Sequence, residues 1–162
     1  MKSFSGFSRS DGAHLTSIPS EFFVNLLPLI DNLFELKVTL YAIWFLEQLE
    51  SKIKFIRYQN FVSDDVFLAG MGKTREEALK NLNLGLQLAV DRNTLLKGSD
   101  ENQPLEDAIY FINSPRGRAA HKGLIAGSWQ VEDQPVPARQ TVRPNIFKWD
   151  NDDGVKHEPG HW

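Results

Sequence analysis

The sequence predicts a mainly α-helical fold that carries a small β-hairpin, an α+β arrangement. Two observations predict it: apolar residues recur at helical spacing in several segments, and two short apolar, β-branched and aromatic runs flank a polar loop. The chain has 162 residues, of which 41% are hydrophobic and 24% charged, as expected for one soluble domain with an extension. We expect a polar arm at 1–17, the domain at 18–129 and a flexible, mostly disordered tail at 130–162.

The first half of the domain is expected to hold two main helices. In "SIPSEFFVNLLPLI" (17–30), Pro19 suits a first helical turn and Pro28 should end or kink the helix. Its apolar residues at helical spacing are Phe22, Phe23, Leu26 and Leu27. The helix from Glu35 to Glu50 is apolar around most of its circumference, so we place it at the centre of the core. A short strand at 54–58 and one or two short helices at 59–70 follow.

The best-marked helix begins at Thr74, which should form a capping box with Glu77. Its predicted buried face consists of Ala78, Leu82, Leu86 and Ala89. Strands are expected at 94–98 and 107–113, and Ser114 and Pro115 start a last helix at 115–127. This is the element order of a winged helix-turn-helix, in which the helix from Thr74 takes the recognition position and residues 98–107 form the wing tip.

Composition limits the classes of function. The chain has no cysteine, so disulfides, thiolate metal sites and cysteine nucleophiles are excluded. The start "MKSFSGFSRSDG" has no apolar signal region, and the longest apolar stretch is too short to span a bilayer, so we expect a cytoplasmic protein. A net charge of −3 argues against a protein whose whole surface binds nucleic acid.

Two short motifs suggest chemistry that their surroundings do not support. "HEPGH" (157–161) fits a zinc-protease pattern, but Pro159 and Gly160 would prevent the helix that brings both histidines to one face. "GMGKT" (70–74) resembles the end of a phosphate-binding loop, but Phe67 stands where the pattern needs a glycine. No triad, metal site or carboxylate pair can be assembled from the remaining residues, so we expect no enzyme, no metal and no cofactor.

Two stretches resemble a known family. "IPSEFFVNLLPLIDNLFELKVTLYAIWFL" (18–46) is similar to the opening of bacterial DnaD-type replication initiation proteins, where Ile-Pro, Phe-Phe and Glu-Leu-Lys-Val-Thr-Leu begin a winged-helix domain. "YFINSPRGRAA" (110–120) is similar to the segment that follows the wing strand in that family. The resemblance covers residues from about 4 to 129. Neither motif is catalytic, so the resemblance implies a fold and a non-catalytic role in replication.

The family continues with a second helical domain, and this chain resembles only its start. "RPNIFKW" (143–149) matches that start over 143–147, and the sequence then departs from the pattern. We expect a natural deletion form or a short paralogue that lacks most of the second domain. In the family the second domain carries much of the DNA binding and the winged helix carries self-association. Ile146, Phe147 and Trp149 are either a remnant or a short segment that orders on a partner.

Charge indicates where DNA would and would not bind. The recognition segment carries Lys73, Arg75, Lys80 and Arg92 against Glu76, Glu77 and Asp91. The wing loop carries only acidic residues, which phosphates would repel: Asp100, Glu101, Glu106 and Asp107. The last helix has cations alone, with the second, third and fourth expected on one face: Arg116, Arg118, His121 and Lys122. This face is either a small phosphate or acidic-partner site or a solvated helix surface.

Apolar residues indicate self-association. Leu84 and Leu88 lie off the predicted buried face of the helix from Thr74, so they either pack within the domain or meet another protomer. Together these observations predict a non-catalytic, DnaD-like primosome component, an oligomeric adaptor for loading the replicative helicase onto DNA. The expected partners are itself, the helicase or its loader ATPase, and DNA weakly or indirectly, without a membrane. The alternative is a winged-helix transcriptional regulator.

Overall fold

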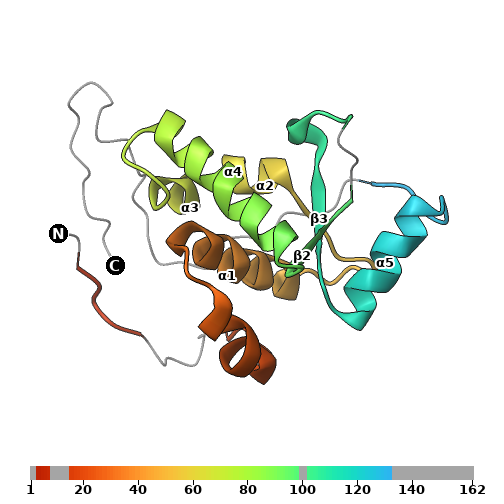
Figure 1. The fold of residues 1–162 in the computed structure, drawn as a ribbon, viewed down its shortest axis with the longest axis horizontal. Helices are drawn as coiled ribbons and strands as arrows, with labels where there is room; N and C mark the ends of the chain where they lie inside the picture. Colours follow the sequence, from red (N-terminus) through yellow and green to blue (C-terminus); the bar gives the residue numbers. More distant parts are fainter. Residues whose placement is uncertain (1–2, 8–14, 99–101, 133–162) are drawn as a thin grey trace.

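The computed structural model describes residues 3–7, 15–98 and 102–132, and within them the mainly helical fold is confirmed (Figure 1). The N-terminal helical segment consists of a π-helical turn, Phe22–Leu26, and a 3-10 turn, Leu27–Leu29. The body follows in the order α1 (Leu33–Gln48), β1 (Ile56–Arg57), α2 (Tyr58–Ser63), α3 (Asp65–Ala69), α4 (Arg75–Asp91), β2 (Leu95–Lys97), a 3-10 turn (Leu105–Asp107), β3 (Ile109–Ile112) and α5 (Pro115–Ile125).

The sheet has three antiparallel strands in the order β1-β3-β2. The predicted hairpin is formed by β2 and β3, with Leu96 opposite Phe111. The short strand predicted at 54–58 joins the same sheet, because Ile56 pairs with Tyr110 on the other edge of β3. After the N-terminal segment, one helix, an edge strand, three further helices and a terminal hairpin follow one another, which is the element order predicted from the sequence for a winged helix-turn-helix.

The core is built where α1 and α4 pack together. The predicted buried face of α4 is confirmed, since Ala78, Leu82, Leu86 and Ala89 are all buried. They pack with the buried residues of α1, which include Val38, Ala42, Phe45 and Leu46. Gly85 permits the close approach of the two helices, because a Cβ there would lie 2.6 Å from the backbone oxygen of Phe34. The predicted central position of the helix 35–50 is therefore confirmed.

Helix α5 packs against the sheet face that α4 does not cover (Figure 1). Phe55, Ile109 and Phe111 form a second buried cluster there. The Trp129 ring stacks on Phe55, and its indole N–H donates to the Ala120 backbone oxygen at 2.8 Å. The chain is therefore held against the sheet beyond the end of α5.

The N-terminal helical segment differs from the expected helix. Pro28 lies inside the closing 3-10 turn and Ile30 is extended, so the helix ends there as predicted. Of the four apolar residues at helical spacing only Phe22 is buried, whereas Leu26 is half-buried and Phe23 and Leu27 are exposed. The segment projects from the body beside α1 (Figure 1).

The predicted tail lies outside the described residues from position 133 onward, as do the motif at 157–161 and the apolar residues at 146–149. None of the helices in the described part of the chain is both long and apolar enough to cross a bilayer.

Candidate interaction surfaces

The exposed charges of α4, the helix in the recognition position, cancel when Lys73 just before the helix is counted with them. Thr74 caps the helix by accepting a hydrogen bond from the Glu77 backbone N–H at 3.0 Å. The three predicted basic contact residues of this segment are exposed, and so are its three acidic residues: Lys73, Arg75 and Lys80 against Glu76, Glu77 and Asp91. A helix without a surplus of positive charge gains little from approaching phosphates.

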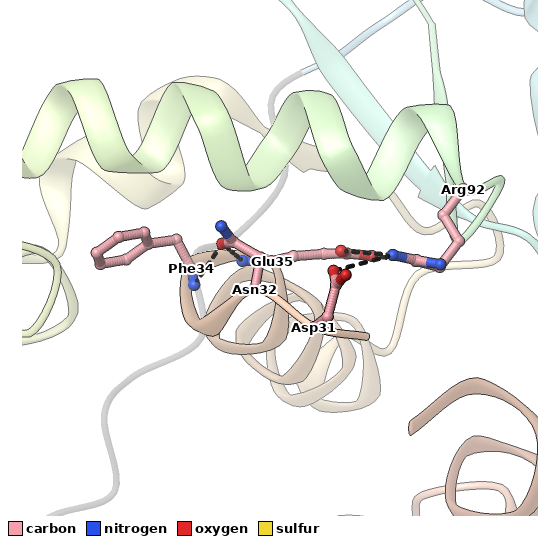
Figure 2. A network of polar contacts seen from close by, with 5 residues as sticks. All are labelled: Asp31, Asn32, Phe34, Glu35 and Arg92. Atoms are coloured by element: carbon pink, nitrogen blue, oxygen red, sulfur yellow. Dashed lines mark hydrogen bonds and ion pairs between the residues drawn. The ribbon is translucent and has the colours of Figure 1, made fainter. Parts of the chain in front are cut away.

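Arg92, counted with the cations of that segment, is engaged inside the protein. Its guanidinium makes two hydrogen bonds to the Glu35 carboxylate, at 2.5 and 3.1 Å, from the end of α4 to the first turn of α1 (Figure 2). Glu35 has no exposed side-chain surface, and Asp31 lies 3.8 Å from Arg92 on the solvent side. The hydrogen bond to Glu35 is the main reason that the pKa of Arg92 is raised.

This ion pair is not predicted by the sequence patterns described above. Glu35 occupies the same side of α1 as the buried residues Val38, Thr39 and Ala42, so its place on an otherwise apolar stripe was the available signal. A carboxylate there needs a cation, because burying an unpaired charge is costly. The same turn is capped by the Asn32 side chain, which accepts from the backbone N–H groups of Phe34 and Glu35 (Figure 2).

Gly70, Gly72 and Thr74 of the "GMGKT" loop have local structural roles. A Cβ on Gly72 would lie 2.6 Å from the Ala78 backbone nitrogen, so glycine lets the loop pass close to the first turn of α4. Thr74 is the cap, and Lys37 donates to the Gly70 backbone oxygen at 2.6 Å. The expectation of a glycine turn that leads into a capped helix fits these contacts.

The cations of α5 divide into two groups. Arg116 donates to the Lys52 backbone oxygen at 2.8 and 3.2 Å, which ties α5 to the loop before β1. His121 is half-buried, with one ring nitrogen 3.0 Å from the Lys97 backbone oxygen and its ring against Phe111. It therefore faces the sheet. Arg118 and Lys122 are exposed, and Arg118 also donates to the Asn113 side chain at 3.1 Å.

The described part of the wing is acidic. Glu106 and Asp107 are exposed in the 3-10 turn that leads into β3, whereas Asp100 and Glu101 lie in the part of the loop outside the described residues. Phosphates would meet two carboxylates at this turn.

Exposed apolar side chains gather at the N-terminal helical segment and the start of α1. We call this the N-terminal apolar surface; its members and their exposed fractions are Phe23 (53%), Val24 (71%), Leu27 (37%), Leu29 (59%) and Leu33 (57%). Of the two leucines predicted to meet another protomer, Leu84 is 43% exposed and Leu88 is half-buried. Leu84 thus offers a second, smaller apolar contact on α4.

The described residues form a mainly helical α+β fold with a three-stranded antiparallel sheet, an N-terminal helical extension and a C-terminal helix. No protein family, curated protein or solved structure matches the chain. Within residues 3–7, 15–98 and 102–132, no three metal-ligating side chains come together.

Proposed function

We propose that this protein is a non-catalytic, DnaD-like component of bacterial replication initiation, a self-associating adaptor that helps bring the replicative helicase or its loader to DNA. The replication role rests on the resemblance of residues 18–46 and 110–120. The adaptor role rests on one structural observation, the N-terminal apolar surface.

This surface is unusual for a protein that acts as a monomer. Five large apolar side chains within Phe23–Leu33 are each more than a third exposed. Contiguous apolar surface of this kind marks an interaction site in soluble proteins, because covering one large side chain contributes about 1.5–3 kcal/mol. The N-terminal helical segment buries only Phe22 of its own residues, so packing within the chain leaves the surface uncovered. A second copy of the chain would cover it.

The alternative, a winged-helix transcriptional regulator, is less well supported. Such a protein reads base edges with the recognition helix and holds phosphates with the wing. Here the exposed charges of α4 and of Lys73 before it sum to zero, and the described wing turn is acidic.

Sedimentation equilibrium of the full chain tests self-association. We expect Phe23→Asp/Leu27→Asp to weaken it at least tenfold, because each aspartate would have to be buried in the interface. The matched control is Ile125→Asp/Val131→Asp, which places two aspartates at exposed apolar positions elsewhere, and it should self-associate like the wild type. A wild-type chain that stays monomeric at high concentration would contradict the proposal.

The replication role has its own test. Immobilised wild-type chain should retain the purified replicative helicase or loader ATPase of the same organism, and Ile125→Asp/Val131→Asp should retain it equally. A chain that self-associates but retains neither protein would leave the self-association standing and refute the replication role.

A further inference from the structure

Positive charge is concentrated in two segments that border the sheet. Residues 51–57 and 108–131 contain no aspartate or glutamate, although the whole chain has a net charge of −3. Their cations, which we call the α5 basic surface, are Lys52, Lys54, Arg57, Arg116, Arg118 and Lys122. Four of the six side chains are exposed, while Lys54 and Arg57 are half-buried.

Hydrogen bonds and ring contacts join these segments into one layer. Arg116 at the start of α5 bonds to the Lys52 backbone oxygen. Arg57 lies over the Phe55 ring, 5.4 Å from its centroid, and donates to the Glu132 backbone oxygen at 3.0 Å. Phe55 in turn stacks on Trp129, beyond the end of α5. The loop before β1, β1 itself and α5 therefore present their cations from one connected part of the fold.

The acidic residues nearest these segments in sequence flank them. Glu50 precedes Ser51, Asp107 precedes Ala108 and Glu132 follows Val131. Neither segment contains an acidic residue, so the six cations give the two segments a net positive charge.

We propose that the α5 basic surface binds the phosphate backbone of duplex DNA, without sequence preference and without α4 or the wing. Cations spread over several elements suit the spaced charges of a duplex, and phosphate contacts carry no sequence information. Of the aromatic rings in this layer, Phe55 and Phe111 are buried and Trp129 is half-buried with its ring stacked on Phe55, so none is a freely exposed anchor of the kind a protein partner would use. The exposed large apolar side chains of the two segments, Ile125 and Val131, are outnumbered by the six cations. The placement of the rings also argues against single strands, which stack their bases on exposed aromatic rings.

The position of this surface is compatible with self-association. Helix α5 lies beside the sheet, whereas the N-terminal helical segment lies below α1 (Figure 1). The two proposals rest on different residues and can fail separately.

Fluorescence anisotropy with a labelled 20-base-pair duplex of mixed sequence tests the inference on the full chain. Lys52→Gln/Arg118→Gln/Lys122→Gln removes three exposed cations and keeps Arg116, which holds the loop. We expect this variant to bind the duplex at least tenfold more weakly at low salt. The slope of log affinity against log salt concentration should be smaller in magnitude by about 2.7, roughly 0.9 for each lost phosphate contact. The control Lys73→Gln/Arg75→Gln/Lys80→Gln removes the same charge from α4 and should stay within about twofold of the wild type.

Three results would overturn the inference: no duplex binding by the wild type at low salt, equal or greater loss in the α4 variant, or unchanged binding in the α5 variant. Polyglutamate serves as the acidic-protein probe, and a wild-type chain that binds it but not the duplex would favour an acidic partner instead. Circular dichroism checks that both variants keep the wild-type helix content. If the triple α5 variant is partly unfolded, Arg118→Gln/Lys122→Gln takes its place, and the expected change in the slope is then about 1.8.

Discussion

At the scale of single residues, the buried carboxylate of Glu35 fixes the start of α1 to the end of α4. It has no exposed side-chain surface and receives both hydrogen bonds from Arg92 (Figure 2). Removing one partner of a buried ion pair leaves an uncompensated charge, whereas replacing both by apolar residues of similar size costs little. The pair therefore specifies how the two helices meet, and it stabilises the fold only while it is complete.

A pair of variants checks this role. We expect Arg92→Met to lower the melting temperature by about 5–10 °C, and Glu35→Met/Arg92→Met to recover most of that loss. Asp31→Asn is the control, because Asp31 is 92% exposed and its ion pair with Arg92 should contribute little. Thermal unfolding followed by circular dichroism measures all three, and a double variant less stable than Arg92→Met would refute the pairing.

Tyr110 makes stability depend on pH in the alkaline range. Burial raises the pKa of its phenol from 10.0 to about 12. The folded state thus holds the phenolic proton more tightly than the unfolded state, so this contribution is complete below pH 10 and is lost as pH rises toward 12. Burial also raises the pKa of Tyr58, so its contribution to stability is likewise lost at alkaline pH.

We expect the wild type to lose about 2–3 kcal/mol of unfolding free energy between pH 10 and 12 through Tyr110. Tyr110→Phe cannot ionise at this position, so its stability should fall less over the same range. Urea unfolding at pH 8, 10 and 12 compares the two proteins. If the unfolding free energies of the wild type and Tyr110→Phe fell equally between pH 8 and 12, Tyr110 would not be the group that titrates.

At the scale of elements, glycines set how closely helices approach their neighbours. Gly85 lets α4 meet the backbone of Phe34, and a Cβ on Gly117 would lie 1.8 Å from the Ile112 oxygen at the junction of β3 and α5. Both contacts are with backbone atoms, which cannot turn away as a flexible side chain can. Glycine is required here by space, and a helix propensity alone would favour alanine.

Gly85→Ala tests this point within α4. Alanine improves helix propensity by about 1 kcal/mol, but we expect a net loss of about 1–3 kcal/mol because α4 must move off α1. Lys80→Ala, at an exposed position of the same helix, should change the unfolding free energy by less than about 0.5 kcal/mol. Urea unfolding measures both, and a stabilised Gly85→Ala would contradict the close packing.

The sequence could predict those elements whose signals are local. Thr74 and Ser114 cap their helices as expected, and the spacing of Ala78, Leu82, Leu86 and Ala89 identified the buried face of α4. The N-terminal helical segment has the same kind of apolar spacing, yet most of it is exposed. Periodicity shows which side chains share a face, but only the tertiary fold decides whether anything covers that face.

The candidate surfaces were less predictable because they depend on contacts far apart in the chain. Its position makes Arg92 one of the predicted recognition cations, although it bonds to Glu35, which is 57 positions away in sequence. Helical spacing predicts His121 on the face of Arg118 and Lys122, but its ring lies against the sheet, with one nitrogen 3.0 Å from the Lys97 backbone oxygen. The sequence does not connect Lys52, Lys54 and Arg57 with α5, because only folding brings that loop to Arg116.

At the scale of the whole molecule, the surfaces suited to binding lie away from the recognition helix. Apolar side chains are exposed at the N-terminal helical segment, beside α1, and cations are concentrated around α5, beyond the sheet (Figure 1). Helix α4 with Lys73, and the described turn of the wing, carry balanced or negative charge. This distribution suits a winged helix that joins macromolecules and does not read base sequence.

Hydrogen–deuterium exchange at a low and a high protein concentration tests the central claim, self-association through the N-terminal apolar surface, most directly. We expect slower exchange at high concentration in peptides that cover residues 20–33, and unchanged exchange in those covering α5. Protection confined to α4 and the wing, or no protection that depends on concentration, would contradict the claim.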